Sequence, residues 1–141
     1  MTSERARKTK PRRAAQSAKS HGQFTVQIKR VYEKPSRDDG QRFLVDRLWP
    51  RGVAKKDLAS VPWLREVAPS AALRKWYGHE PEKWPEFRKR FREELRKNAA
   101  SWKPLVEAIQ KGNVTLLTAS RDVEICNATV LKEFLLEKIS R

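Results

Sequence analysis

The sequence predicts an α/β fold in which a small, mainly parallel sheet of three or four strands is flanked by helices. Short runs of β-branched and aliphatic residues alternate along the chain with segments whose apolar residues recur every three or four positions. Strands interleaved with helices form parallel sheets through right-handed crossovers. The charge is also uneven, and its distribution divides the chain into a basic tail and one domain.

Residues 1–23 are predicted to be a disordered basic tail, and residues 24–141 a single domain. The tail has seven Lys and Arg residues against one acid, Glu4, and after Met1 it has no aliphatic residue larger than Ala. Such a segment buries too little apolar surface to offset the entropy lost on ordering. Two interpretations stay open: a solvated leader that aids solubility, or an arm that contacts nucleic-acid phosphates without sequence preference.

Three segments have the pattern of strands. Residues 24–32 alternate apolar and polar side chains and are rich in β-branched types, which predicts the first strand. Residues 42–46 predict a short buried strand that ends before Pro50 and Gly52. Residues 113–118 predict the last strand, because they contain the strongest apolar run of the chain.

The segments between the first two strands and the helices are predicted to be irregular. Residues 35–40 are dense in turn formers and predict a loop. Residues 55–58 are compatible with one helical turn. Residues 61–67 are predicted to be an edge strand or an extended loop, because Pro62 cannot donate an interior strand hydrogen bond.

Four helices are predicted in the second half of the chain. The first has Ser70 as its N-cap and ends at Gly78, which suits a left-handed C-terminal residue. In the second, Pro85 suits the first turn, and the four-residue spacing of its apolar side chains defines one face. That face consists of Phe87, Phe91 and Leu95.

The remaining two helices flank the last strand. One is predicted over 101–111, capped by Ser101 and ended by Gly112. The other is predicted over about 124–138, with its apolar residues on one stripe. Cys126 would then lie in its first turn, and it is predicted either to be a small buried hydrophobe or, with a base in reach, a nucleophile.

Composition excludes several classes of protein. The net charge is +15, and no apolar run approaches the ~20 residues of a membrane span. The basic start of the chain lacks the apolar stretch of a signal peptide, so we expect a cytoplasmic location. A single cysteine allows no intramolecular disulfide, and the scattered His and acidic residues predict no metal site. No GxGxxG or P-loop pattern occurs, so no cofactor is identified.

Polar clusters follow two of the predicted strands. Asp46, Arg47, Trp49 and Arg51 follow the second strand, and a further cluster with Ser120 and Arg121 follows the last. In open α/β sheets, ligands bind beyond the carboxyl ends of the strands. Arg guanidinium groups match phosphate and carboxylate oxygens in a bidentate manner. The sequence therefore predicts a pocket for a small anionic, phosphate- or nucleotide-like ligand.

The candidate residues fall into two groups, acid/base residues and ligand-binding residues. Asp46 and His79 are the acid/base candidates, since a His side chain moves protons near neutral pH. The predicted ligand-binding residues are Arg47, Trp49, Arg51, Ser70, Arg74, Tyr77, Ser120, Arg121 and Asn127. Each has a structural alternative as a helix cap, a turn residue or a core side chain. Whether the protein is an enzyme stays open.

The motif Val45-Asp46-Arg47-Leu48-Trp49-Pro50-Arg51-Gly52 is similar to the signature of the YeaO-like proteins, the domain of unknown function numbered 488. Four further matches are Lys29–Tyr32, Pro69-Ser70 with Leu73-Arg74, Gly78-His79 with Phe87-Arg88, and Thr115–Leu117 with Ser120. The resemblance covers about 25–138. The resemblance implies a small bacterial cytoplasmic α/β protein. It does not identify a catalytic residue in this chain.

One position departs from the family pattern. Many relatives carry Asn-His or Asn-Asn before the Ala of the last helix, whereas this chain has Cys126-Asn127-Ala128. A mechanism that used the His of those relatives would not be shared. The basic tail is likewise an addition of this chain.

An alternative function is association with nucleic acid through the tail and a basic helix face. The basic residues of that helix are Arg88, Lys89, Arg90, Arg92, Arg96 and Lys97. A charge run on a helix is more often a solvated face, so the pocket is the preferred hypothesis. The sequence leaves open whether the protein is a monomer or a homodimer.

Overall fold

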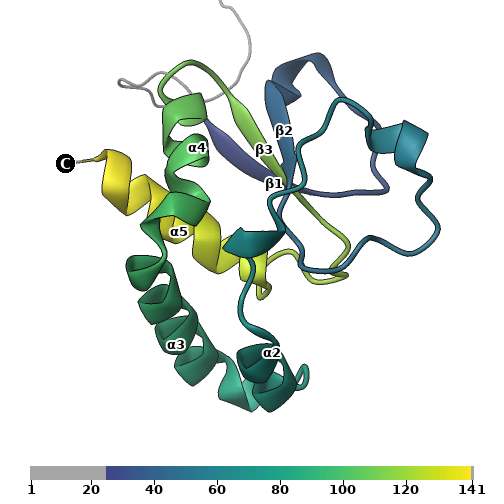
Figure 1. Ribbon diagram of the computed structural model, residues 1–141. Helices are drawn as coiled ribbons and strands as arrows, with labels where there is room; N and C mark the ends of the chain where they lie inside the picture. The colour runs from purple at the N-terminus through teal and green to yellow at the C-terminus, as the bar shows by residue number, and fades with distance from the viewer. Residues whose placement is uncertain (1–24, 141) are drawn as a thin grey trace, which may run out of the picture.

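Three parallel strands form the sheet at the centre of the molecule (Figure 1). The computed structural model describes residues 25–140, so the predicted disordered tail lies outside the described residues. The strands are β1 (Val26–Arg30), β2 (Gln41–Leu44) and β3 (Val114–Thr118), in the order β1-β3-β2. The predicted α/β fold with a small parallel sheet is confirmed.

The central strand β3 holds the sheet together. It pairs with both neighbours, so that Val114 lies opposite both Val26 and Gln41, and all five of its residues are buried. A strand covered on both faces is a continuous apolar run, which is why its prediction from sequence differs by only one residue. The outer strands are shorter than predicted. β2 ends at Leu44, because Asp46 turns away to hydrogen-bond the end of β3.

Four helices accompany the sheet, with α4 and α5 packed beside it and α2 and α3 extending away from it (Figure 1). Their bounds are α2 (Ala71–Tyr77), α3 (Trp84–Lys97), α4 (Ala99–Ile109) and α5 (Asn127–Ile139). Short 3-10 turns are η2 (Arg37–Asp39), η3 (Lys55–Leu58), η4 (Arg65–Val67) and η5 (Pro81–Lys83). None of the helices within residues 25–140 is both long and apolar enough to span a membrane.

The helix α2 begins and ends as its sequence predicts, and the predicted first turn and apolar stripe of α3 are also observed. The Ser70 hydroxyl accepts a hydrogen bond from the Leu73 N–H, which satisfies one free donor of the first turn of α2. Gly78 follows α2 with a left-handed backbone, and its N–H donates to the Arg74 carbonyl. In α3, Pro85 lies in the first turn and the predicted apolar stripe is buried.

Two helix starts differ from the prediction. α4 begins at Ala99, so Asn98 is the N-cap, and the Ser101 hydroxyl donates to the Asn98 carbonyl instead of capping the helix. α5 begins at Asn127, three residues later than predicted. The chain before it is held in a turn, because the Asp122 carboxylate accepts from the Glu124 N–H. Cys126 is therefore the N-cap residue of α5 and does not lie in its first turn.

The segment 61–67 is mostly irregular. It makes one parallel bridge to the sheet, between Trp63 and Leu44, and then forms η4. Trp63 also packs edge-to-face on Trp49, with 5.3 Å between the ring centroids. Both Trp side chains pack against a small second core of four buried aliphatic residues, Leu44, Leu58, Val61 and Leu117.

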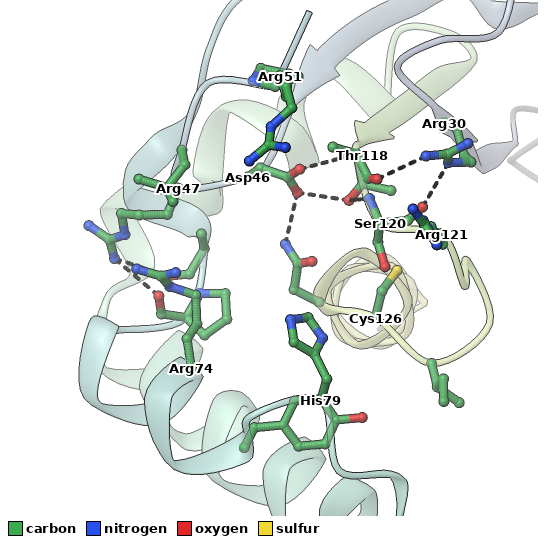
Figure 2. Close-up of a pocket in the computed structure, with 18 of the residues that line it drawn as sticks. Arg30, Asp46, Arg47, Arg51, Arg74, His79, Thr118, Ser120, Arg121 and Cys126 are labelled. Atoms are coloured by element: carbon green, nitrogen blue, oxygen red, sulfur yellow. Dashed lines mark hydrogen bonds between the residues drawn. The ribbon is translucent and has the colours of Figure 1, made fainter.

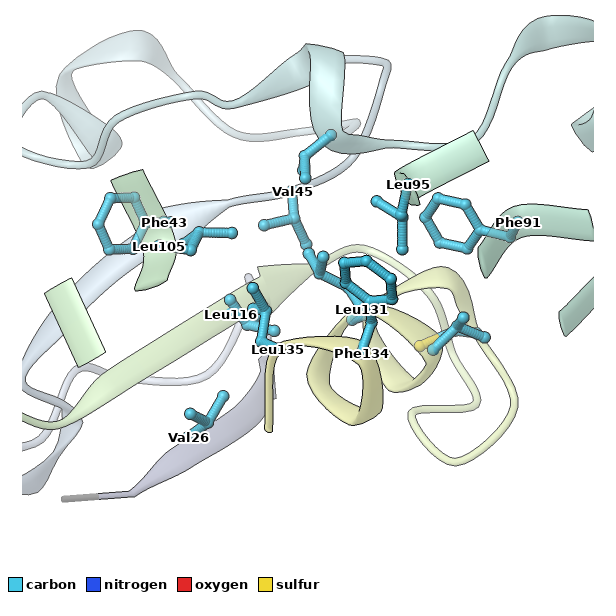
Figure 3. Packing of buried hydrophobic residues seen from close by; sticks show 14 of the residues in the cluster. Val26, Phe43, Val45, Phe91, Leu95, Leu105, Leu116, Leu131, Phe134 and Leu135 are labelled. Carbon is cyan, nitrogen blue, oxygen red and sulfur yellow. The ribbon is translucent and has the colours of Figure 1, made fainter. Parts of the chain in front are cut away.

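The main core lies between the sheet and the helices (Figure 3). Apolar residues of all three strands meet the apolar faces of α3, α4 and α5 there. Figure 3 shows members of this cluster from each of these elements, namely Val26, Phe43, Leu116, Phe91, Leu105 and Phe134. Burial of such side chains stabilises the fold by about 1.5–3 kcal/mol each.

A buried carboxylate ties the loop before β2 to the sheet. Asp39 accepts hydrogen bonds from Gln27 Nε2 at 2.9 Å and from Lys29 Nζ at 3.1 Å, while its carbonyl accepts from Thr115 Oγ1 at 2.7 Å. Burial raises the pKa of the Asp39 carboxyl, but the Ser36 N–H and the Lys29 ammonium outweigh burial and hold the pKa below its ordinary value of 3.8. The charged form of Asp39 is therefore favoured in the folded protein.

This linkage gives a pH dependence. Because the folded pKa of Asp39 is lowered, its contribution to stability is complete above the unfolded pKa and is lost as the pH falls through the folded pKa. We expect Asp39→Asn to cost about 1–3 kcal/mol at pH 7 and to flatten the acid limb of the stability profile. Urea unfolding between pH 7 and pH 2 measures both effects. An unchanged acid limb in the variant would contradict this account.

Glycine is required at position 40. Gly40 has φ +63°, and a Cβ there would lie 2.0 Å from the Asn113 carbonyl oxygen. We expect Gly40→Ala to destabilise the protein by about 3 kcal/mol, because strain and a backbone clash combine. Gly52 is the matched control, since it also has a positive φ, +80°, but a Cβ would meet nothing within 4 Å. Chemical denaturation of both variants should show a clearly larger loss at position 40.

Candidate functional site

A pocket of about 820 Å³ lies beyond the carboxyl ends of the strands. Arg74 and His79 enter it from α2 and the turn after it, whereas Asp46, Thr118 and Ser120 enter it from the strand ends (Figure 2). The start of α5 completes the lining. This is the edge of the sheet at which parallel α/β folds bind ligands.

The structure brings together all but one of the residues predicted to form a site. The residues that line the pocket include Asp46, Arg47, Trp49, Arg51, Arg74, Tyr77, His79, Ser120, Arg121 and Asn127. Ser70 is not among them. Its hydroxyl donates to Glu94 Oε2 at 2.7 Å and caps α2, so its observed contacts are structural.

Asp46 joins three segments at the sheet edge. Its carboxylate accepts from Thr118 Oγ1 and from the Ala119 N–H, both at 2.8 Å, and from Asn127 Nδ2 at 3.4 Å. Asn127 Nδ2 also donates to the Val45 carbonyl at 3.2 Å. Asp46 thus fastens the exit of β2 to the exit of β3 and to the first residue of α5, and both of its oxygens are engaged.

Two arginines of the pocket lining carry buried donors without an acceptor among the described residues. Arg47 reaches the carbonyls of Ala68 and Pro69 with its NH2 group, at 3.3 and 3.4 Å. Its Nε atom and that of Arg74 are both buried and make no hydrogen bond within residues 25–140. A buried donor without a partner is costly, and Arg92, which does not line the pocket, has one as well, so this feature is not specific to the pocket.

Arg30 and Tyr32 were not predicted as site residues. Arg30 donates to the carbonyls of Ser120 and Ala119, at 3.0 and 3.2 Å, and its guanidinium lies over the Tyr32 ring. The Tyr32 hydroxyl donates to the Arg51 carbonyl at 2.9 Å. Arg30 therefore holds the loop that carries Arg121, and Tyr32 holds the loop that carries Arg51. Both residues belong to the Lys-Arg-Val-Tyr motif, which could have marked them as candidates. The strand pattern of this segment alone does not show which distant residues their side chains contact.

Aromatic rings form one wall of the pocket. Tyr77 stacks on Phe87 with 4.5 Å between centroids, and the His79 ring is 6.4 Å from that of Tyr77. Burial, followed by the negative charge of Asp122, raises the pKa of the Tyr77 phenol above its ordinary value of 10.0, so the hydroxyl keeps its proton at neutral pH. His79 is the one non-glycine residue with positive φ within residues 25–140, at 60°. That conformation turns the chain back after α2.

The other predicted residues differ in how firmly they are held. Trp49 donates to the Val53 carbonyl at 2.6 Å and packs on Trp63, so much of its surface serves the second core. Arg51 and Arg121 are exposed at the rim of the pocket. Cys126 lines the pocket as a buried free thiol, with Sγ 3.6 Å from Thr129 Oγ1.

Residues 25–140 contain no group of three or more His, Cys, Asp or Glu side chains arranged to hold a metal ion. The polar groups of the pocket lining are guanidinium, ammonium, imidazole, hydroxyl and amide groups and the single carboxylate of Asp46.

Comparison with known families assigns the chain. Residues 25–141 match the family model described as the inactive DUF488-N3 subclade. The chain belongs to the DUF488 family. The resemblance seen in the octapeptide that begins at Val45 is thereby confirmed. The family match begins at residue 25.

Relatives of this DUF488 chain include two bacterial proteins that are themselves named as uncharacterised. Rv3073c of Mycobacterium tuberculosis H37Rv is 46% identical over 110 residues, which cover 78% of this chain and 92% of the relative. YeaO of Escherichia coli K12 is 39% identical over 112 residues, which cover 79% of this chain and 97% of the relative. No solved structure matches the chain.

The hydrogen bonds of Asp46 generate a prediction for this DUF488 chain. We expect Asp46→Asn to lower the free energy of unfolding by about 1–3 kcal/mol, because an amide cannot accept all three hydrogen bonds. Thermal unfolding monitored by circular dichroism gives the measurement. Glu107→Gln, at an exposed acid on α4, is the control for the loss of a negative charge. Equal stability of the two variants would exclude a fastening role for Asp46.

Proposed function

We propose that the protein binds a small anionic, phosphate- or nucleotide-like ligand in the pocket at the carboxyl ends of its strands. The observation that carries the proposal is the charge of the lining. Six cationic side chains border the pocket, and the lining has one carboxylate, that of Asp46. The cationic residues are Arg30, Arg47, Arg51, Arg74, Lys75 and Arg121.

The single carboxylate does little to neutralise these cations through direct contact. Asp46 directs its oxygens to Thr118, Ala119 and Asn127, and forms no ion pair within the described residues. Glu66 lies 3.7 Å from Arg47, but its side chain is 72% exposed, so water weakens the attraction. The pocket therefore keeps a positive potential that draws anions.

The guanidinium groups of the lining favour an oxyanion in particular. Guanidinium groups bind phosphate and carboxylate oxygens through charge-assisted, often bidentate hydrogen bonds. The start of α5 also borders the pocket, and the first N–H groups of a helix have no partner within the helix. Guanidinium groups and a helix start together match a ligand with several negatively charged oxygens.

Binding without turnover is favoured over catalysis. The matching family model is described as inactive. Asp46, one predicted acid/base residue, already accepts three hydrogen bonds that fasten the fold. His79, the other, is exposed at the pocket and has no charged partner within the described part of the chain. Position 127, next to the departure from the family pattern, contributes an amide that holds Asp46.

The contacts of α3 weigh against the alternative of a nucleic-acid-binding helix face. Arg88 bonds to Glu133 of α5 at 2.7 Å, Arg90 bonds to Glu86 at 2.9 Å, and Arg92 bonds to Glu137. Three of the basic side chains are therefore directed at carboxylates of the protein itself. The tail, which was the other element of that hypothesis, lies outside the described residues.

The test is titration of inorganic phosphate and nucleoside monophosphates by calorimetry. We expect Arg74→Gln to weaken binding about 10- to 100-fold, because it removes a charge-assisted hydrogen bond worth about 1.5–3 kcal/mol. Arg121→Ala should weaken binding less, because its side chain is exposed at the rim. Arg96→Ala on α3 removes the same charge away from the pocket and is the matched control. Equal affinities of the Arg74 and Arg96 variants would refute the proposed site.

A further inference from the structure

The size of the pocket exceeds what a simple ion needs. Cavities of about 300–1,000 Å³ typically accept organic molecules with a largely apolar body and a few polar groups. The pocket here has a volume of about 820 Å³. A single tetrahedral oxyanion held between Arg47 and Arg74 would fill a small part of it. The remaining space can therefore hold a body attached to the anionic group of a ligand.

The walls of this remaining space are aromatic and apolar. Tyr77, His79, Phe87, Ile125 and Cys126 all line the pocket. Two of these rings are held in place from behind, because Tyr77 stacks on Phe87 at an interplanar angle of 26° and Phe87 stacks in turn on Trp84. A ring that is already fixed loses little conformational entropy when a ligand packs on it.

The aromatic wall and the arginines are adjacent. Arg74 and Tyr77 are three residues apart on α2, and side chains at this spacing share one face of a helix. His79 follows directly, and its left-handed backbone turns it toward the same pocket. Figure 2 shows Arg74 and His79 rising from the same side. One molecule can thus contact the cationic and the aromatic parts together.

We infer that the ligand is an anion that carries an aromatic ring, with its oxyanion at Arg47 and Arg74 and its ring against Tyr77 and His79. This inference rests on the proposed anion site and names the class of ligand that it accepts. The phenol of Tyr77 stays protonated at neutral pH, so this wall does not add a negative charge that would repel the ligand. Stacking on aromatic side chains selects planar rings over saturated ones of similar size.

The experiment compares three probes on the full chain by calorimetry: inorganic phosphate, phenyl phosphate and cyclohexyl phosphate. We expect phenyl phosphate to bind about tenfold more tightly than either of the others. His79→Ala is the first variant, because the side chain is exposed and its removal leaves the core intact. It should reduce the advantage of phenyl phosphate severalfold and leave the affinity for inorganic phosphate within twofold. His79→Phe, which restores a ring, should recover part of the advantage.

Tyr77→Leu is the second variant, and its melting temperature shows whether it folds. Loss of the phenyl advantage in either ring variant supports the inference. Equal binding of all three probes would overturn the inference and leave the anion site in place. Equal binding of phenyl and cyclohexyl phosphate, both tighter than phosphate, would overturn the choice of an aromatic ring. A phenyl advantage that persists in both variants would overturn the assigned wall, and no binding of any probe would overturn the anion site as well.

Discussion

The carboxylate of Asp46 is the contact on which the pocket edge of the sheet depends. It connects the exit of β2 to the exit of β3, through Thr118 and Ala119, and to the first residue of α5 through Asn127. Without it, three segments that are far apart in the sequence would end near one another with no common anchor. The positions of the pocket arginines follow from this anchor, because Arg47 comes directly after it and Arg121 lies just beyond Ala119.

The electrostatics of the pocket follow from how the chain uses its acidic residues. Many carboxylates of the described residues are committed elsewhere: Asp39 to Lys29, and the glutamates of α3 and α5 to arginines of α3. The arginines at the sheet edge bond mostly to carbonyl oxygens, as Arg30 and Arg47 do. A carbonyl oxygen is neutral, so its hydrogen bond leaves the positive charge of the guanidinium uncompensated. The excess charge of the domain is thereby displayed at the pocket.

Sequence patterns predicted the sheet, the helices and most of the pocket, because these depend on local periodicity and on the shared edge of parallel strands. They did not predict the start of α5, since a turn held by the Asp122 carboxylate competes with helix formation there. They also missed Arg30 and Tyr32, whose contacts lie about 90 and 19 residues away along the chain. Ser70 was assigned to the site from its motif, whereas its partners are the helix it caps and Glu94.

The parallel sheet also separates two kinds of structural constraint. The contact of Gly40 with Asn113 lies at the amino ends of β2 and β3, whereas the pocket residues lie at the opposite ends of the same strands. Effects of substitutions at distant, independent sites are usually additive. Changes in the pocket loops therefore leave the junction between Gly40 and Asn113 undisturbed. The two ends of the sheet can in this way be altered independently of each other.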